Sequence, residues 1–405
     1  MNKKTKNSGI PWIGEIPESW NVSKVKDAFV RKNVKAHQEN PIVLSLARSG
    51  VKVRDISNNE GQIAESYFDY NPVDVDDLLI NPMDLYSGAN CSISKVKGVI
   101  SPAYVNLRHK ENVCPRYYDY YFKTQYWAMA FFAHGKGISF DNRWTLGIDT
   151  LFNYYIPSPS YEEQKAIADF LDKKCDEIDK MIAIQEKFIE ELKAYKQSVI
   201  TETVCRGLNP NVPLKDSGVD WIDVTPEHWE VRAIKTMALL KSGDNLTSLD
   251  IDENVTLYPV YGGNGVRGYY SQYNHDGDYA LIGRQGALCG NVNYGYGKFW
   301  ATEHCVVCHP KCNFILKWFG ESLRAMNLNQ YSLSSAQPGI SVDRINNVKM
   351  LVPPIQEQQE IAYYLDEKCN KIDSLITIKQ QKIEELQDYK KSLIYEYATG
   401  KKQVI

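Results

Sequence analysis

The sequence predicts an α+β protein with two similar halves: two domains in a pseudo-twofold tandem repeat, joined by two long antiparallel coiled-coil helices. Three observations predict this fold. They are an internal repeat, two long segments with apolar residues in 4-3 spacing, and short strand-like segments between them. We predict a first domain at 1–158, a first helix at 159–207, a second domain at 208–353, and a second helix with the C-terminal tail at 354–405. At roughly 100–200 residues per domain, a chain of 405 residues has room for this organisation.

The repeat has two parts with different offsets. Residues 8–20 return as residues 217–229, at an offset of 209. Residues 162–200 align without a gap to residues 356–394, at an offset of 194, with 20 identities in 39 positions. Because 209 − 194 is 15, the second intervening segment is 15 residues shorter. A duplication that keeps the helices while the intervening segments diverge indicates one scaffold that carries two different recognition surfaces.

Each repeated segment predicts a long helix with a narrow apolar seam. Ser160 and Glu163 have the spacing of an N-terminal capping box, and Gly207 and Gly400 stand where C-terminal caps are expected. Strict 4-3 spacing is typical of a coiled coil rather than of a helix lying on a globule. The predicted seam consists of Leu171, Ile178, Ile182, Gln185, Ile189 and Leu192 in the first copy, and Leu365, Ile372, Ile376, Lys379, Ile383 and Leu386 in the second.

The order of the elements predicts the direction of the helices. The first helix leads from domain one to domain two, and by quasi-symmetry the second leads back, so the pair is antiparallel. Gln185 and Lys379 interrupt the two seams near their midpoints, and we predict that they are neighbours that set the register. From 171 to 199 the helix rises by roughly 42 Å at 1.5 Å per residue, close to one turn of B-DNA at roughly 34–36 Å.

The two intervening segments predict short strands and one helix each. Residues 77–81 and 104–107 in the first segment, and 279–284 and 305–308 in the second, have the composition of strands. The aromatic-rich stretches 117–132 and 314–331 predict helices packed on a sheet; stacking platforms for unpaired bases are the less favoured interpretation.

Composition limits the class of protein. The net charge is −3, so the chain is poorly supplied for strong unaided DNA binding, and any DNA-bound form needs a partner that contributes phosphate contacts. Nine cysteines, a polar Lys-rich N-terminus and no long apolar run predict a soluble cytoplasmic protein with free thiols.

Two motifs resemble cofactor or metal sites. Residues 263–268 match G-x-G-x-x-G, but the next residues do not predict a helix, so we interpret the motif as a flexible loop. Residues 305–309 match the haem pattern C-x-x-C-H, and Cys305, Cys308 and Cys312 could ligate zinc with a nearby histidine. The intervening valines instead predict a strand that points Cys305 and Cys308 to opposite faces, which favours unligated core thiols. We find no catalytic constellation and predict that the chain is not an enzyme.

Taken together, these features resemble the specificity (S) subunits of type I restriction–modification systems over nearly the whole chain. The resemblance rests on the repeated Trp-Ile…Pro-Glu…Trp pattern at 12–20 and 221–229, and on the Pro…Glu-Gln segments at 159–164 and 353–358. Further matching segments are 98–104, 259–263 and 282–286.

The resemblance implies that each domain is a target recognition domain for one half of a split, asymmetric DNA site, and that the helices set the gap between the halves. It implies two modification subunits, which carry S-adenosylmethionine and methylate adenines. Restriction subunits, which use ATP and Mg²⁺, would join them. No cofactor is expected on this chain, and no membrane contact.

Candidate base-contacting residues are long polar side chains on predicted loops. Arginine suits guanine, whereas asparagine and glutamine suit adenine, because of their bidentate geometry. The candidates are Arg48, Lys52, Arg54 and Arg143 in the first domain, and Asn264, Arg267, Arg284, Gln285 and Gln337 in the second. The alternative hypothesis is a coiled-coil adaptor that binds proteins rather than DNA, and a metal- or haem-dependent enzyme is a third.

Overall fold

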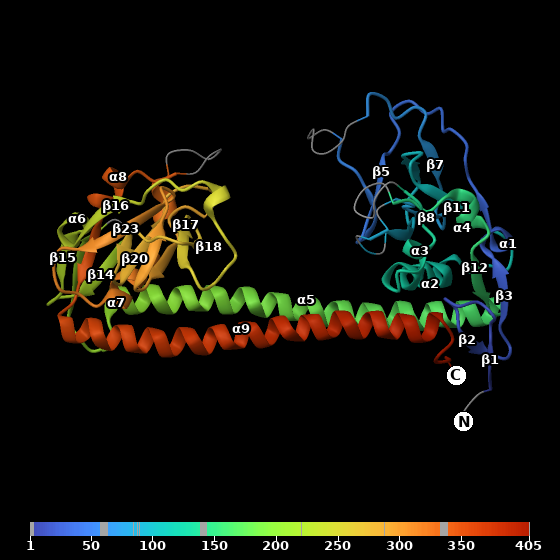
Figure 1. Ribbon diagram of the computed structural model, residues 1–405. Helices are drawn as coiled ribbons and strands as arrows, with labels where there is room; N and C mark the ends of the chain where they lie inside the picture. Colours follow the sequence, from blue (N-terminus) through green and yellow to red (C-terminus); the bar gives the residue numbers. More distant parts are fainter. Residues whose placement is uncertain are drawn as a thin grey trace. The chain divides into compact units, whose positions relative to one another are not determined.

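The chain folds into two compact units, each with one globular domain and part of both long helices. The computed structural model describes residues 4–56, 64–83, 85–86, 88, 90–137, 144–219, 221–286, 288–332 and 339–404. One unit comprises Met1–Gln185 with Gln381–Ile405, and the other comprises Glu186–Gln380 (Figure 1). Both ends of the chain therefore belong to the first unit.

The first domain contains twelve short strands and four helices. These are β1 (Thr5–Asn7), β2 (Glu15–Pro17), β3 (Asn21–Lys24), α1 (Val25–Ala28), β4 (Phe29–Arg31), β5 (Leu44–Ala47), β6 (Gly50–Val53), β7 (Asn71–Val73), β8 (Leu78–Ile80), β9 (Cys91–Ile93), β10 (Gly98–Ile100), β11 (Val105–His109), α2 (Pro115–Trp127), α3 (Ala130–Ala133), α4 (Ile148–Phe152) and β12 (Tyr155–Ser158) among the described residues.

The second domain follows the same plan after the first long helix, α5 (Tyr161–Arg206). Its elements are β13 (Leu214–Val219), β14 (Ile222–Pro226), β15 (Glu230–Ala233), α6 (Ile234–Met237), β16 (Ala238–Ser242), η1 (Ser248–Asp250), β17 (Tyr258–Gly262), β18 (Gly265–Tyr270), β19 (His275–Asp276), β20 (Tyr279–Gly283), β21 (Val292–Gly295), β22 (Lys298–Ala301), β23 (Cys305–Pro310), α7 (Leu316–Ala325), η2 (Leu328–Tyr331), α8 (Val342–Asn346) and β24 (Lys349–Val352). The second long helix, α9 (Ile355–Ala398), completes the chain.

A four-stranded antiparallel sheet lies at the centre of each domain. The strand order is β4-β11-β8-β9 in the first domain and β16-β23-β20-β21 in the second, and the two sheets are equivalent. The offset between equivalent elements is 209 from α1 to α6 and 194 from α4 to α8. The 15-residue difference therefore lies in the connections between these points, while the sheet and its flanking elements are retained.

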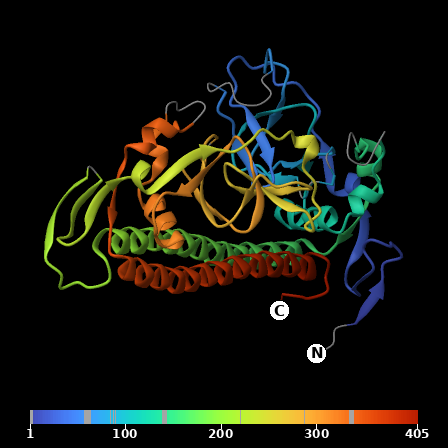
Figure 2. The ribbon, with the colours of Figure 1, turned by 60° about the vertical axis from the view of Figure 1, so that its left-hand side comes forward.

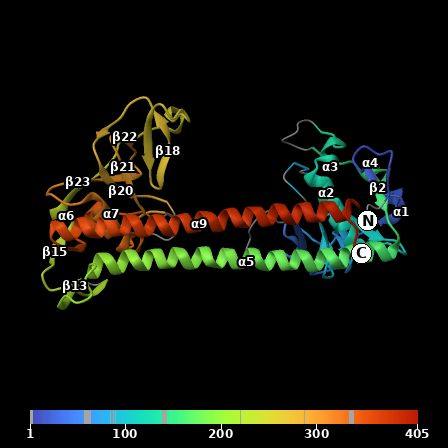
Figure 3. The ribbon, with the colours of Figure 1, turned by 90° about the horizontal axis from the view of Figure 1, so that it is seen from below.

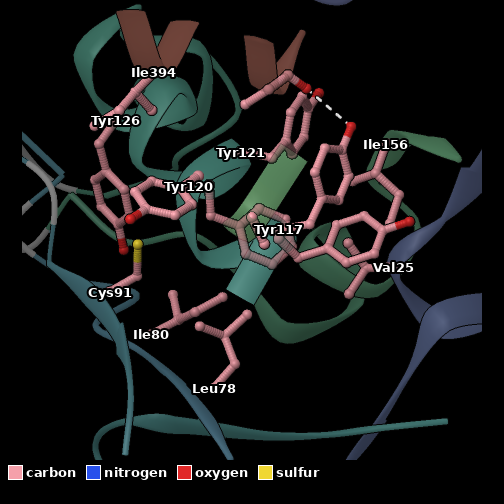
Figure 4. Close-up of a cluster of buried hydrophobic side chains, with 14 of the residues drawn as sticks. Val25, Leu78, Ile80, Cys91, Tyr117, Tyr120, Tyr121, Tyr126, Ile156 and Ile394 are labelled. Carbon is pink, nitrogen blue, oxygen red and sulfur yellow. Dashed lines mark hydrogen bonds between the residues drawn. The ribbon is translucent and has the colours of Figure 1, made fainter. Parts of the chain in front are cut away.

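An aromatic helix packs on each sheet, as predicted, but it is shorter than the predicted stretch: α2 ends at Trp127 and α7 at Ala325. In the first domain, Tyr117, Tyr120, Tyr121 and Tyr126 of α2 are buried with aliphatic side chains of the sheet (Figure 4). In the second, Trp318 and other α7 side chains belong to the equivalent core. These rings are inside the domains, so they cannot act as exposed platforms for bases.

The two long helices run antiparallel within each unit, and Figures 2 and 3 show them side by side. In the first unit Lys390 Nζ lies 2.7 Å from Asp179 Oδ1, and in the second unit Lys196 Nζ lies 2.7 Å from Asp373 Oδ2. Since 373 − 179 and 390 − 196 are both 194, these ion pairs are the same contact of the sequence repeat, made once in each unit. The predicted antiparallel pairing is confirmed inside each unit.

All twelve predicted seam residues are buried or half-buried. Lys379 places its ammonium group over the ring of Phe188, 5.0 Å from the centroid. In an antiparallel helix pair, the residue numbers of two facing residues add up to a nearly constant sum. This sum is 567 for Phe188 and Lys379 and 569 for both ion pairs, whereas it is 564 for Gln185 and Lys379. The contact between Gln185 and Lys379 stays a prediction, because the two residues belong to different units.

The ends of the long helices match the predicted caps. The backbone N–H of Glu163 donates to Ser160 Oγ at 3.3 Å at the start of α5. Gly207 and Gly400 have φ of +75° and +76°, the left-handed conformation that ends helices without a Cβ clash. A Cβ on Gly207 would lie 3.1 Å from the Trp229 ring, so this C-cap also seats one of the repeated tryptophans.

A buried glutamine ties each aromatic helix to a long helix. Gln164 Oε1 accepts from the backbone N–H of Cys114, and its Nε2 donates to the Pro159 carbonyl, both at 2.9 Å. Gln358 makes the same two contacts in the second unit, with the Ile315 N–H at 3.0 Å and the Pro353 carbonyl at 2.9 Å. The repeated Glu-Gln sequence is therefore an attachment point for the domain.

One sequence interpretation was wrong. Residues 263–268 do not form a flexible loop: Gly265 begins strand β18, which pairs with β17 in a hairpin. Antiparallel pairing with β17 gives hydrogen-bond partners to backbone groups that a loop would expose to water. The prediction that no helix begins there is confirmed.

No described helix is both long enough and apolar enough to cross a membrane.

Replacing Gln164 with alanine should destabilise the first unit, because the buried N–H of Cys114 would lose its acceptor. We expect a loss of about 1–3 kcal/mol in the free energy of unfolding, measured by urea denaturation. The matched control is Gln381→Ala on the exposed surface of α9. Equal stabilities for the two variants would contradict the attachment role.

Candidate nucleic-acid interface

Arg48, Lys52 and Arg54 of the first domain lie on or beside one hairpin. Arg48 lies in the turn between β5 and β6 and is exposed, and Lys52 is exposed on β6. Arg54 follows β6, is half-buried, and donates its backbone N–H to the Val43 carbonyl at 2.8 Å. Arg143 lies outside the described residues. Three of the four candidates are thus brought together by β5 and β6.

The hairpin β17–β18 presents two candidates of the second domain. Asn264 lies in its turn and is exposed, and its Oδ1 accepts from Asn291 Nδ2 at 2.8 Å. Arg267 is exposed on β18, and a Cβ on Gly262 would lie only 2.3 Å from Arg267 Cδ, so the arginine stem crosses that glycine. Gln337 lies outside the described residues.

Arg284 and Gln285 follow β20 and are held by their backbone. Arg284 donates its N–H to the His304 carbonyl, and its own carbonyl accepts from the Ile340 N–H, both at 2.9 Å. Gln285 forms an isolated bridge with Gly339. The backbone at both positions is therefore held by contacts with residues distant in sequence.

A cavity of about 490 Å³ adjoins this segment. It is lined by Ser242, Arg284, Gln285 and residues 339–343. Ser242 Oγ accepts a hydrogen bond from Arg284 Nη1 at 3.2 Å. Sequence reasoning missed Ser242, since a serine at the end of a strand carries no signal that it supports a residue 42 positions away.

Two further cations of the first domain are held in structural ion pairs. Asp77 is fully buried and is contacted by Arg108 Nε at 2.6 Å and by Lys32 Nζ at 3.3 Å. Lys32 also donates to Asp74 and lowers the pKa of that carboxyl group. These cations hold acidic groups of the fold, whereas Arg48, Lys52 and Arg267 are exposed.

The cysteine cluster lacks the geometry of a metal site. Cys305 and Cys308 lie on β23 and point to opposite faces of the sheet, into two different cores. Burial raises the pKa of the Cys305 thiol to about 12. Among the described residues, no group of three or more histidine, cysteine, aspartate or glutamate side chains is arranged to hold a metal ion. The predicted strand with its cysteines on opposite faces is confirmed.

The chain is similar to a known protein family. The model described as the type I restriction modification DNA specificity domain matches residues 226–388. The chain is 42% identical over 146 residues to the Escherichia coli type I restriction enzyme EcoprrI specificity subunit, an alignment that covers 35% of this chain and 36% of that protein. It is 25% identical over 366 residues to the Methanocaldococcus jannaschii type I restriction enzyme MjaVIII specificity subunit, covering 81% of each chain.

Two solved structures share the fold. A chain solved to explain complex assembly and conformational transition in a type I R-M system has a TM-score of 0.70 at 14% identity, covering 95% of this chain and 98% of that chain. The HsdS subunit of Thermoanaerobacter tengcongensis has a TM-score of 0.51 at 14% identity, with the same coverage. The predicted fold, with two tandem domains and long connecting helices, is confirmed.

Purified protein should contain no stoichiometric zinc, because the thiols of Cys305 and Cys308 face different cores. Elemental analysis measures this directly, and a chelator should leave the unfolding transition unchanged. One zinc per chain, lost together with stability on chelation, would contradict the assignment of Cys305 and Cys308 as core thiols.

Proposed function

We propose that this chain is a specificity subunit of a type I restriction–modification system, and that it reads DNA for a methyltransferase and endonuclease complex. Each domain reads one half of a split, asymmetric site. The paired helices set the spacing between the halves. The chain directs adenine methylation by modification subunits and cleavage by restriction subunits, and it has no catalytic role of its own.

One observation carries this proposal: two domains share a frame and differ in the exposed residues on it. The sheet order, the aromatic helix and the glutamine attachment are the same in both domains. The connections are different, with Arg48 and Lys52 on the first hairpin and Asn264 and Arg267 on β17–β18 of the second. A common frame with different polar side chains suits two different DNA half-sites.

The helix pair supports the proposed role in spacing. Ion pairs in each unit, between Asp179 and Lys390 and between Lys196 and Asp373, connect the same positions of the two copies. Sliding one helix along the other would break both pairs and expose the apolar seam to water. A pairing that resists sliding can keep a constant gap between half-sites.

An apolar stripe that is repeated on the two long helices supports the proposal that the chain binds two copies of one partner. Met181 and Ile184 on α5 correspond at an offset of 194 to Leu375 and Ile378 on α9. All four side chains are between 43% and 57% exposed, and they lie outside the seam. Because large apolar side chains repeated on an exposed face mark interaction sites, we assign the two stripes to two modification subunits.

The adaptor hypothesis is not favoured by the comparisons, because the matching family and relatives are named for DNA specificity in restriction systems. S-adenosylmethionine, ATP and Mg²⁺ belong to the partner subunits in this proposal. The net charge of −3 agrees with it as well, since partner subunits would supply much of the contact with phosphates.

A base-resolution methylation map tests the proposed function. DNA from cells with this chain and a type I modification subunit is compared with DNA from cells that lack only this chain. We expect a split, asymmetric motif whose adenine methylation disappears without the chain. Identical maps from both cells would contradict the proposal.

Substitutions in the stripes test the assignment of the partner. Ile184→Ser and Ile378→Ser should each remove one copy of the modification subunit, because each exposes a hydroxyl where an apolar contact forms. Native mass spectrometry of the co-purified complex counts the copies, and the double variant should retain neither. Leu239→Ser is the control, at a residue that is 52% exposed but lies on β16. A double variant that keeps both copies would contradict the assignment.

A further inference from the structure

The backbone after β8 in the first domain makes the same hydrogen bond as the backbone after β20 in the second. The Pro82 carbonyl accepts from the Leu146 N–H at 2.8 Å, and the Arg284 carbonyl accepts from the Ile340 N–H at 2.9 Å. Leu146 and Ile340 are related by the offset of 194, and both are buried. Positions 82 and 284 therefore occupy one place in the common frame.

The side chains at this place are chemically different. Pro82 is buried and offers no hydrogen-bond donor, whereas Arg284 is half-buried and carries a guanidinium group with five N–H donors. One of these donors is held by Ser242, at 3.2 Å. The residue equivalent to Ser242, at the offset of 209, is Asn33. Both the arginine and its hydroxyl support are thus particular to the second domain.

The remaining donors of Arg284 face an open cavity. Within the described chain, Ser242 is the acceptor of its side-chain hydrogen bond, and the other N–H groups have no protein partner. Asp343 lies on the rim of the cavity and forms no ion pair with a described residue. Its equivalent at the offset of 194 is Asp149, so this carboxylate is common to both domains and cannot distinguish the half-sites.

We propose that Ser242 is a positioning residue that aims Arg284 at a guanine of the second half-site, and that the first domain lacks this means of reading. The hydroxyl takes one N–H of the guanidinium and fixes its plane. The outer N–H pair then remains for O6 and N7 of guanine, the bidentate contact that separates guanine from the other bases. This inference rests on the proposed function of the chain as a DNA specificity subunit.

The test measures base selectivity in the assembled methyltransferase. Arg284→Ala should lower the preference for guanine at one position of the second half-site by roughly 5- to 150-fold. Ser242→Ala should lower the preference at the same position by about 2- to 12-fold, and Ser242→Thr should restore it because the hydroxyl returns. The first half-site should keep its selectivity in all three variants. Arg232→Ala is the matched control, because this arginine is exposed on β15, pairs with Glu230 and does not line the cavity.

The results distinguish failure of the proposed function from failure of the positioning role of Ser242. A wild-type chain that directs no methylation would contradict the proposed function and this inference together. Wild-type methylation with unchanged selectivity in Ser242→Ala, or with equal losses in Ser242→Ala and Ser242→Thr, would overturn the positioning role alone. Relaxation of a different position by each variant would also overturn it. Thermal unfolding and co-purification of each variant identify a general loss of structure, which would relax no single position.

Discussion

The attachment of each domain to the paired helices is the constraint on which the rest of the structure depends. A buried glutamine at the start of each long helix, Gln164 or Gln358, holds the backbone where the aromatic helix begins. A cation on that aromatic helix also pairs with a repeated aspartate: Arg116 with Asp172 in the first unit, and Lys317 with Asp366 in the second. Because these contacts join the domain to its helix, the connections on the other side of the sheet can change without disturbing the scaffold.

Inside each domain, cations hold buried acidic groups of the fold. Lys32 and Arg108 are used to neutralise the buried Asp77, and Arg324 contacts Glu321, which is also buried. Exposed polar side chains on the hairpins include Arg48, Lys52 and Arg267. In the proposed function, affinity for DNA depends on the complex, while this chain contributes the choice of sequence.

The fold was largely predictable because its signals are local or repeated. Gly207 and Gly400 marked helix ends, and the apolar spacing marked the seam, since each depends on neighbouring residues alone. The equivalence of Pro82 and Arg284 could not be predicted, because it depends on backbone contacts with Leu146 and Ile340 that are distant in sequence. The motif at 263–268 was misinterpreted for a related reason: its strand character comes from pairing with β17 rather than from its own glycine-rich composition. Among the candidate base contacts, Arg143 and Gln337 lie outside the described residues.

Hydrogen exchange of the assembled complex, with cognate DNA and with DNA of unrelated sequence, tests the central claim most directly. The claim is that a common frame holds two different reading surfaces. Cognate DNA should slow exchange at the hairpins 44–53 and 258–270 and at 284–286, while the buried attachment at 159–164 and 353–358 stays unchanged. Equal protection by both DNAs, or protection confined to the long helices, would contradict the account.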